Sequence, residues 1–324
     1  MYTQSHTAPE GSDSGDSFKP ESHGRARIRQ AVSWGLYPLL IAGIVLAWAL
    51  SKSFGWPLSK ALLVYAAARF ALLFACEFLL PARREWGMSW ASFQRDLKFA
   101  AVNAATMKLF RLGVVALAID ASQYNLGLLN GAPIWVEVPV VLLTYEFFQY
   151  WVHRISHSDQ GSVGRFLWRV HAAHHLPNGV YLLMHTVGHP LNLALVMMVS
   201  APLVVLGASS DALFVFGALL GLQGLVSHLN VDVRVGPLNY LLTGTELHRY
   251  HHSAALAESK NYGAITPFWD IVFGTFVYRP GVLPDRISVT EPEKYPLSED
   301  VLRVLRLPFA ANGHEKSAPT KSVA

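Results

Sequence analysis

Two long apolar runs near the N-terminus most constrain what this chain can fold into. Residues 34–50 carry no charged side chain, and residues 58–80 carry Arg69 and Glu77 in their interior. About 20 apolar residues suffice for a helix to cross the hydrocarbon core of a bilayer, where each backbone polar group must be paired within the helix. The runs therefore predict a helical hairpin in a membrane, with both charged side chains turned toward other helices.

Further apolar segments follow along the chain. They are residues 99–119, 134–151, 191–206 and 213–226. Lys108 and Arg111 interrupt the first, and the second is aromatic and contains Glu137 and Glu146. The last two are separated by a Gly-Ala-Ser-Ser-Asp turn and predict another hairpin, which is short for a full crossing. We therefore expect an all-α integral membrane helical bundle.

The composition agrees with a membrane protein and excludes other classes. The 324 residues are 52% hydrophobic, and their mean hydropathy is +0.29, which is high for a soluble chain. The net charge is only +4, and basic residues are dispersed among apolar spans, so nucleic acid is not an expected partner. Cys76 is the single cysteine, which excludes an intrachain disulfide or a cluster of thiolate ligands. Any metal must be held by nitrogen or oxygen.

Polarity divides the chain into four parts. Residues 1–28 are too polar to bury a core and are expected to be a disordered cytoplasmic tail. Residues 29–130 hold the N-terminal transmembrane helices, and residues 131–280 hold the histidine clusters. Residues 281–324 form a C-terminal cytoplasmic segment, with a loose end from about Asn312.

Basic residues beside the spans predict the orientation. Arg25, Arg27 and Arg29 precede the first span, which places the N-terminus in the cytoplasm. Four crossings then return the chain to that side just before His153, and the short hairpin returns it again before His228. The loops expected inside are rich in arginine, whereas those expected outside hold few basic residues. The histidine clusters are thus expected to form a cytoplasmic helical cap on a multi-pass protein.

Nine of the 14 histidines fall in four places. They are His153, His157, His171, His174, His175, His228, His248, His251 and His252. The first cluster is H-x-x-x-H, and residues at i and i+4 lie about 40° apart around a helix, so both rings can share one metal. The second and third clusters have the pattern H-x-x-H-H, and His228 stands alone.

A metal is the best reading of this pattern, although single pieces of it have structural explanations. One H-x-x-x-H pair or one lone histidine is commonly structural, but two H-x-x-H-H clusters would crowd imidazoles without a shared purpose. Eight or nine imidazoles exceed the needs of one tetrahedral ion, so two metals are implied. Imidazole binds iron, copper, nickel and zinc alike. The absence of thiolate ligands and the lipid-embedded body favour oxygen chemistry by iron over hydrolysis.

Several motifs between Glu137 and Tyr278 carry a family resemblance. They are Tyr-Trp-Val-His-Arg-Ile-Ser-His at 150–157, the clusters at 171–175 and 248–253, His-Leu-Asn at 228–230, Lys-Asn-Tyr-Gly at 260–263 and Trp-Asp-Ile-Val-Phe-Gly-Thr at 269–275. In this order they resemble the fatty acid hydroxylase and sterol desaturase superfamily of membrane di-iron enzymes. Glu146 stands where many members carry Asp, and the N-terminal 130 residues match only in being membranous.

The resemblance implies an O2-dependent oxidoreductase of lipid biosynthesis. Residues 131–280 would be its catalytic domain, with the nine histidines holding two iron ions and no further cofactor. The enzyme would hydroxylate a C–H bond of a fatty acyl chain, a sterol or a related lipid that enters sideways from the bilayer. Electrons would come from a separate protein of ferredoxin, rubredoxin or cytochrome b5 type, because no fused carrier domain is visible.

Other side chains around the histidines are expected to support the metal site. Glu146, Asp270 and Glu246 are expected to accept the second N–H of the imidazoles, as carboxylates do around many metal sites. A helix cap or an ion pair is an equally good role for Asp270. His185 and His189 are further candidates for the metal site, but His189 precedes Pro190 at an expected helix start, which a structural role explains as well.

Alternatives remain open at this stage. Within the superfamily, the chain could be a lipid desaturase or an ether-lipid or alkane monooxygenase, which differ in product mass. A histidine-rich metal transporter is the non-enzyme alternative, but its ligands should lie along a path near the middle of the spans. An inactive member acting as a structural partner is a further alternative, against which the intact clusters argue.

Overall fold

The chain is all-helical in the part that a computed structural model describes. That part comprises residues 22–116, 121–158 and 160–310. It contains no strand, and an isolated bridge between Ser253 and Ile287 is its only β-type pairing. The expected all-α class is therefore confirmed. The first helix begins at His23, so the expected tail is wrong for its last residues, while residues 1–21 and the end from Asn312 lie outside the described part.

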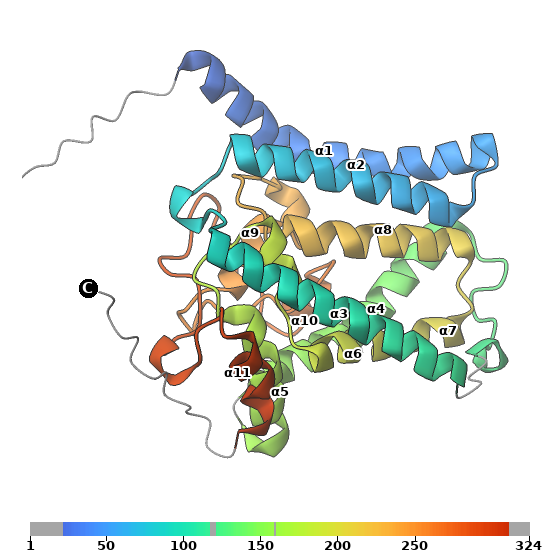
Figure 1. Ribbon diagram of the computed structural model, residues 1–324. Helices are drawn as coiled ribbons and strands as arrows, with labels where there is room; N and C mark the ends of the chain where they lie inside the picture. Colours follow the sequence, from blue (N-terminus) through green and yellow to red (C-terminus); the bar gives the residue numbers. More distant parts are fainter. Residues whose placement is uncertain (1–21, 117–120, 159, 311–324) are drawn as a thin grey trace, which may run out of the picture.

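The helices follow one another with short connections (Figure 1). The α-helices are α1 (His23–Phe54), α2 (Leu58–Leu79), α3 (Trp90–Ala116), α4 (Ile134–Ser156), α5 (Gly161–His175), α6 (Pro190–Met198), α7 (Pro202–Leu206), α8 (Ser210–Val226), α9 (Thr245–His251), α10 (Phe268–Val272) and α11 (Val301–Arg306). Short 3-10 turns are η1 (Arg84–Trp86), η2 (Ala121–Tyr124), η3 (Leu182–Thr186), η4 (Gly236–Tyr240), η5 (Pro292–Lys294) and η6 (Leu307–Phe309).

The predicted N-terminal hairpin is present as α1 and α2. Ser22 caps α1 by accepting a hydrogen bond from the Arg25 backbone N–H, and Gly55 ends it with a φ of 64°, a conformation that glycine adopts without strain. Both helices are long and apolar enough to cross a membrane, and they alone meet that test within the described residues. The described residues of the crossings expected near 99–119 and 134–151 are helical, as parts of α3 and α4, but neither helix meets the same test.

The second predicted hairpin differs from the expectation in its first arm. Residues 191–206 do not form one helix, because α6 ends at Met198 and α7 begins at Pro202. Pro202 has no N–H to donate to the Met198 carbonyl, so the helical ladder is interrupted there. The second arm is the continuous α8, whose Ser209 cap accepts a hydrogen bond from the Ala212 N–H.

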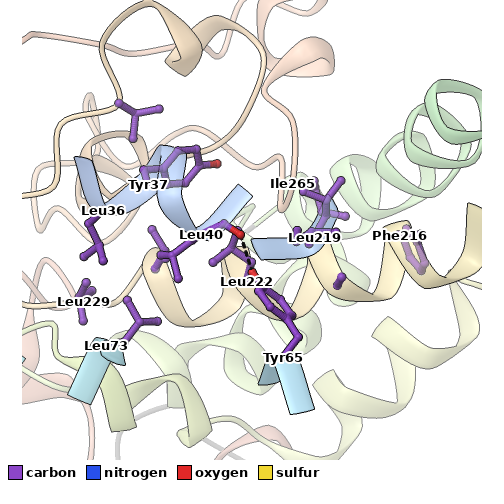
Figure 2. Packing of buried hydrophobic residues seen from close by; sticks show 14 of the residues in the cluster. Leu36, Tyr37, Leu40, Tyr65, Leu73, Phe216, Leu219, Leu222, Leu229 and Ile265 are labelled. Atoms are coloured by element: carbon purple, nitrogen blue, oxygen red, sulfur yellow. Dashed lines mark hydrogen bonds between the residues drawn. The ribbon is translucent and has the colours of Figure 1, made fainter. Parts of the chain in front are cut away.

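Helix α8 lies at the centre of the apolar core. Helices α1, α2 and α4 pack around it, and Figure 2 shows Leu40 of α1 and Leu73 of α2 beside Leu222 of α8. The Tyr65 hydroxyl donates to the Leu40 carbonyl at 3.0 Å, which satisfies a buried polar group where α1 and α2 meet. Because α8 is fixed on several sides, the residue that follows its C-terminal end, His228, is fixed as well.

The bundle has two distinct ends. At one end the Arg25 guanidinium donates to the Leu79 carbonyl, and the Ala82 N–H donates to the Asn230 carbonyl at 2.8 Å. The start of α1, the end of α2 and the segment after α8 therefore lie together, and α5, α9 and α11 gather toward the same end in Figure 1. At the opposite end, Lys52 pairs with Asp211 at 2.7 Å.

Candidate metal centre

The four histidine clusters converge at the first of these ends. They form two groups, and in each group the candidate nitrogens lie within 4.8 Å of one another. The first histidine group is His153, His157, His171 and His251. The second histidine group is His174, His228, His248 and His252. The side chains in both groups are buried or half-buried, so the arrangement can bind a cation at each of two adjacent places.

Helical spacing explains why the sequence clusters are divided between the groups. On a helix, a residue at i+4 stays about 40° from residue i, whereas a residue at i+3 lies about 60° to the other side. His171 and His174 of α5 accordingly belong to different groups. In α9 and the residue after it, His248 and His252 point to the second group and His251 to the first.

His175 lies between the two groups and belongs to neither set of four. Its Nε2 is 3.0 Å from the Nε2 of His171. Its ring centroid lies 4.8 Å from that of His251 and 4.5 Å from that of His252, one in each group. All nine predicted histidines are thus brought together, with His175 at the junction.

Backbone carbonyls orient the rings of the first group. The Nδ1 atom of His153 is 2.7 Å from the Tyr262 carbonyl oxygen, and that of His251 is 3.0 Å from the Lys260 carbonyl oxygen. A neutral imidazole that donates its Nδ1–H to a carbonyl keeps the lone pair on Nε2. Both rings therefore present an Nε2 acceptor toward the centre of the group.

Backbone carbonyls also orient two rings of the second group, but they belong to other residues. His174 Nδ1 is 2.8 Å from the Val187 carbonyl, and His228 Nδ1 is 2.8 Å from the Gly224 carbonyl of the preceding helical turn. The rings are again turned so that Nε2 faces inward. The supporting carbonyls here come from η3's C-terminal side and from α8, and not from the loop that supports the first group.

The nitrogen positions fit metal ions. The Nε2 atoms of His153 and His171 are 3.0 Å apart, as are those of His228 and His248. Two ligands at right angles on a metal with bonds of about 2.1 Å would lie about 3 Å apart. In addition, the buried Nε2 of His157 and of His251 have no hydrogen-bond partner. Facing lone pairs and unpaired buried nitrogens are costly unless a cation lies between them.

Burial keeps these imidazoles neutral. Desolvation lowers the pKa of His153 to about 4, with the hydrogen bond to Tyr262 opposing the shift. The pKa values of His157, His171 and His175 lie well below the ordinary 6.5 for the same reason, and neighbouring histidines add to the effect. Neutral imidazole is the form that binds a metal, so the site is ready to bind at neutral pH.

The predicted carboxylates are close to the site but bind other groups. Glu146 accepts hydrogen bonds from the backbone N–H groups of residues 264 and 265, at 3.0 and 2.5 Å. Asp270 accepts from those of residues 262 and 263, both at 2.8 Å, and from the Thr275 hydroxyl. The expectation that they accept imidazole N–H groups is therefore wrong. They instead fix the loop whose carbonyls do so.

Glu246 is likewise not bonded to a histidine. It accepts from the Val235 backbone N–H at 2.9 Å and from the Asn239 side chain at 2.7 Å. These bonds hold the loop before α9 against the start of that helix. The expectation for Glu246 is therefore wrong too, and in four of the nine rings a backbone carbonyl occupies the second nitrogen instead.

The two uncertain histidines have different positions. His189 caps α6 by accepting from the Leu191 N–H, and its Nε2 faces the Leu305 carbonyl at 3.1 Å, so it is structural. His185 lies beside the second group, with its ring centroid 5.6 Å from that of His228. Although part of His185 is exposed, desolvation by neighbouring protein atoms lowers its pKa to about 4, with His174 and Arg69 acting in the same direction.

Sequence reasoning missed the groups that orient the rings. They are the carbonyls of Lys260, Tyr262, Val187 and Gly224 and the side chain of Asn192, whose Oδ1 is 3.3 Å from His171 Nδ1. A backbone carbonyl leaves no mark on the sequence. Only the Lys-Asn-Tyr-Gly motif pointed to this loop.

Known proteins match the region that builds this centre. The sequence profile of the fatty acid hydroxylase family matches residues 138–275, which include all nine histidines, Glu146 and Asp270. This stretch of the chain is therefore a fatty acid hydroxylase domain. The resemblance drawn from the motifs is confirmed, and the match to this iron-dependent family indicates an oxidoreductase.

Individual proteins similar to this chain match different shares of its length. The ornithine lipid hydroxylase OlsE of Rhizobium tropici is 28% identical over 305 residues, which are 90% of this chain and 88% of that protein. The very-long-chain aldehyde decarbonylase GL1-11 of Oryza sativa subsp. indica is 27% identical over 176 residues, 51% of this chain and 63% of that protein. The same protein of subsp. japonica matches equally. No solved structure matches the chain significantly.

Proposed function

We propose that this chain is an integral membrane lipid hydroxylase that uses O2 and two iron ions held by its nine clustered histidines. The observation that carries the proposal is the pair of buried histidine groups, each with its nitrogens within 4.8 Å of one another. Imidazoles without thiolates suit iron among other metals, and the superfamily is iron-dependent. Two groups and a histidine between them support two ions sharing one site.

The catalytic unit in this proposal is residues 131–280, and residues 281–324 form a C-terminal cytoplasmic segment. Bound iron would supply the activation of O2 and the oxidising power needed to attack an unactivated C–H bond. The histidines hold the ions through Nε2, and the carbonyls of Tyr262 and Lys260 keep two of the rings in place. Glu146 and Asp270 are positioning residues, because they bind the backbone of the loop that carries these carbonyls.

Burial of the centre contributes to the chemistry as well. His251 and His252 have no exposed surface, so bulk water does not compete for their nitrogens. Excluding water protects a strong oxidant from side reactions and strengthens each polar contact within the site. The protein's part is thus to fix the metals, keep water out and align the substrate carbon.

The proposed membrane placement has α1 and α2 crossing the bilayer, with the N-terminus and the histidines on the cytoplasmic side. The contacts at the end of the bundle support this, because the arginine-rich start of α1 meets the C-terminal end of α2 beside Asn230. Basic residues favour the cytoplasmic side of a span. A site at this level can accept a lipid directly from the bilayer.

One relative that aligns over most of both chains suggests the first substrate to test. OlsE is named as an ornithine lipid hydroxylase and aligns over most of both chains. We therefore propose an amino-acid-containing or related acyl lipid as the substrate. We also propose a separate electron carrier of ferredoxin, rubredoxin or cytochrome b5 type.

The function can be tested by lipid mass spectrometry. Cells with and without the chain are supplied with ornithine lipid, and the purified protein is assayed for iron. The proposal expects a lipid heavier by one oxygen and about two iron atoms per chain. A lipid lighter by two hydrogens would indicate desaturation instead, and metal flux into vesicles without oxygen consumption would indicate a transporter. A His251→Ala variant that inserts into the membrane but makes no product is the control.

A further inference from the structure

A buried arginine in α2 has no carboxylate partner among the described residues. Arg69 lies in the apolar interior of the helix and is 8% exposed. Its Nη1 donates to the Ala218 carbonyl at 3.3 Å, and its guanidinium lies over the Tyr65 ring at 5.1 Å. Its buried Nε has no hydrogen-bond partner, and no carboxylate pairs with it among the described residues. An ionisable residue left in this state within a membrane helix marks a functional site by default.

Glycines on one face of α8 make room for this side chain and for a second polar group. A Cβ added at Gly221 would lie 3.2 Å from Arg69 Nη2, and one added at Gly224 would lie 2.5 Å from His185 Cε1. Positions i and i+3 are neighbours on a helix surface, and His228 follows one turn later on the same face. The guanidinium and the His185 imidazole therefore lie side by side on α8, and the imidazole lies next to the second histidine group.

His185 is also without a polar partner. The structure describes no hydrogen bond to either of its ring nitrogens, and its side chain is exposed although it borders the buried second group. An accessible imidazole that contacts His228 on one side can donate an N–H to a molecule on its other side. The charged Arg69 guanidinium and the neutral His185 imidazole thus both have an unpaired donor beside the same face of α8.

We propose that Arg69 and His185 form a polar subsite that binds an oxygen of the substrate lipid, a carboxylate or an ester carbonyl, beside the second histidine group. The guanidinium fork suits oxygen acceptors, and a charged donor in an apolar surrounding binds them more strongly than a neutral one. The subsite would fix the polar part of the lipid, and thereby the distance from that part to the carbon that reacts. It rests on the proposed function and names the substrate feature that the centre selects.

A purely structural role leaves part of this arrangement unexplained. The stacking on Tyr65 and the bond to Ala218 stabilise the guanidinium, but the Nε donor and the positive charge stay unsatisfied. A leucine or methionine would fill the same volume without that penalty. The glycine at 221 would also be unnecessary if only helix packing were required, because alanine is the better helix former.

Binding of three probes of equal chain length tests the subsite without turnover. The full-length, iron-loaded protein in detergent is incubated with palmitic acid, methyl palmitate or hexadecane, and retained probe is measured by mass spectrometry after gel filtration. The wild type should bind the two oxygen-bearing probes at least ~10-fold more tightly than hexadecane, as expected for charge-assisted hydrogen bonds. Arg69→Met and His185→Phe should lose that preference and bind hexadecane as before.

Matched controls separate binding from packing. Tyr37→Phe removes a buried hydrogen bond from Gln223 of α8 but leaves the printed contacts of Arg69 with Tyr65 and Ala218 in place, so it should keep the wild-type preference. Arg69→Lys keeps the positive charge and should retain part of the preference for the oxygen-bearing probes. If Arg69→Met and His185→Phe weaken the binding of palmitic acid alone, the subsite binds a carboxylate. If they weaken the binding of both oxygen-bearing probes, it binds a carbonyl oxygen.

Unchanged preference in a folded Arg69→Met protein would overturn the proposal. Should that variant not fold, His185→Phe decides instead, because Phe retains the ring shape beside Gly224. A fall in iron content in His185→Phe would assign His185 to the metal group and also overturn the subsite. Failure of the proposed function would appear differently, as a wild-type protein without iron and without an oxidised lipid product, whatever its preference among the probes.

Discussion

The two histidine groups have nearly the same composition but are supported in different ways. Two rings of the first group form hydrogen bonds to carbonyls of the loop at 260–265, and Glu146 and Asp270 accept hydrogen bonds from backbone N–H groups of that loop. Two rings of the second group form hydrogen bonds to the carbonyls of Val187 and Gly224. The exposed His185 lies next to this group. Carboxylates thus fix the loop behind the first group, whereas the second group has an exposed histidine beside it. The same sequence motif can therefore serve two distinct environments.

The largest expected effect comes from removing one ring from either group. We expect His251→Ala and His174→Ala each to lower product formation by more than ~100-fold, since losing a ligand costs at least as much as losing its support. Each variant should also lose metal, measured as iron per chain in the purified protein. Product at near wild-type levels in either variant would remove that residue from the proposed ligand set.

His189→Ala provides the matched control for these variants. His189 caps α6 outside both groups, so its loss should cost only about 1 kcal/mol of stability, typical of a lost cap. Iron content should stay at the wild-type level. This control distinguishes loss of a ligand from general damage to a histidine-rich region.

Because Glu146 and Asp270 support the first group, removing one of these carboxylates should weaken the binding of one metal ion more than that of the other. In Asp270→Asn, the amide NH2 would face a backbone N–H donor where a carboxylate oxygen now accepts. We expect a stability loss of about 1–3 kcal/mol from the unsatisfied donors. Metal affinity should fall ~10–100-fold for one of the two ions, as is usual for a lost outer partner. Glu146→Gln should act in the same direction, more weakly.

A two-step metal titration of the apo-protein measures this difference. If both steps weaken equally, the loop does not support one group selectively and the comparison fails. Asp96→Asn is the control, because Asp96 is a buried carboxylate that accepts hydrogen bonds from Tyr181 and Arg95 away from the histidines. It should lose stability but keep both titration steps.

Acidification should release metal from both groups. The folded pKa values of the nine clustered histidines lie below 6.5, with His153 at about 4, so the unfolded chain binds more protons than the folded one in the interval between. The stabilising effect is therefore present above pH 6.5 and is lost as the pH falls toward 4, at about 1.4 kcal/mol per pH unit for each histidine that titrates. Iron content and melting temperature measured from pH 7.5 to 4.5 should fall together. Full iron occupancy at pH 4.5 would contradict this.

Much of the fold and most of the centre followed from the sequence because both rest on periodic patterns. Apolar runs specify helices, and H-x-x-H-H spacing brings rings to adjacent faces, so α1, α2, α8 and the histidine clusters were predictable. The break between α6 and α7 was missed, since a single Pro202 was outweighed by an apolar run. The roles of Glu146 and Asp270 were assigned one step too close to the rings, because the carbonyls that intervene belong to the backbone and have no side-chain signature.

The smallest expected effect tests the accessible side of the second group with a single methyl group. In Gly224→Ala, the new Cβ would meet His185 Cε1 at 2.5 Å, so the ring must move, whereas in Gly217→Ala the nearest atom is Leu62 Cδ2 at 3.9 Å, an ordinary contact. Alanine is the better helix former by about 0.5–1 kcal/mol, so Gly217→Ala should be stabilising by up to that amount. Gly224→Ala should be close to neutral in melting temperature, since a side chain and not backbone gives way. It should nevertheless weaken palmitic acid binding several-fold at unchanged iron content. Equal binding by both variants would mean that the position of His185 does not matter to the lipid, and that the two histidine groups differ only in how they are supported.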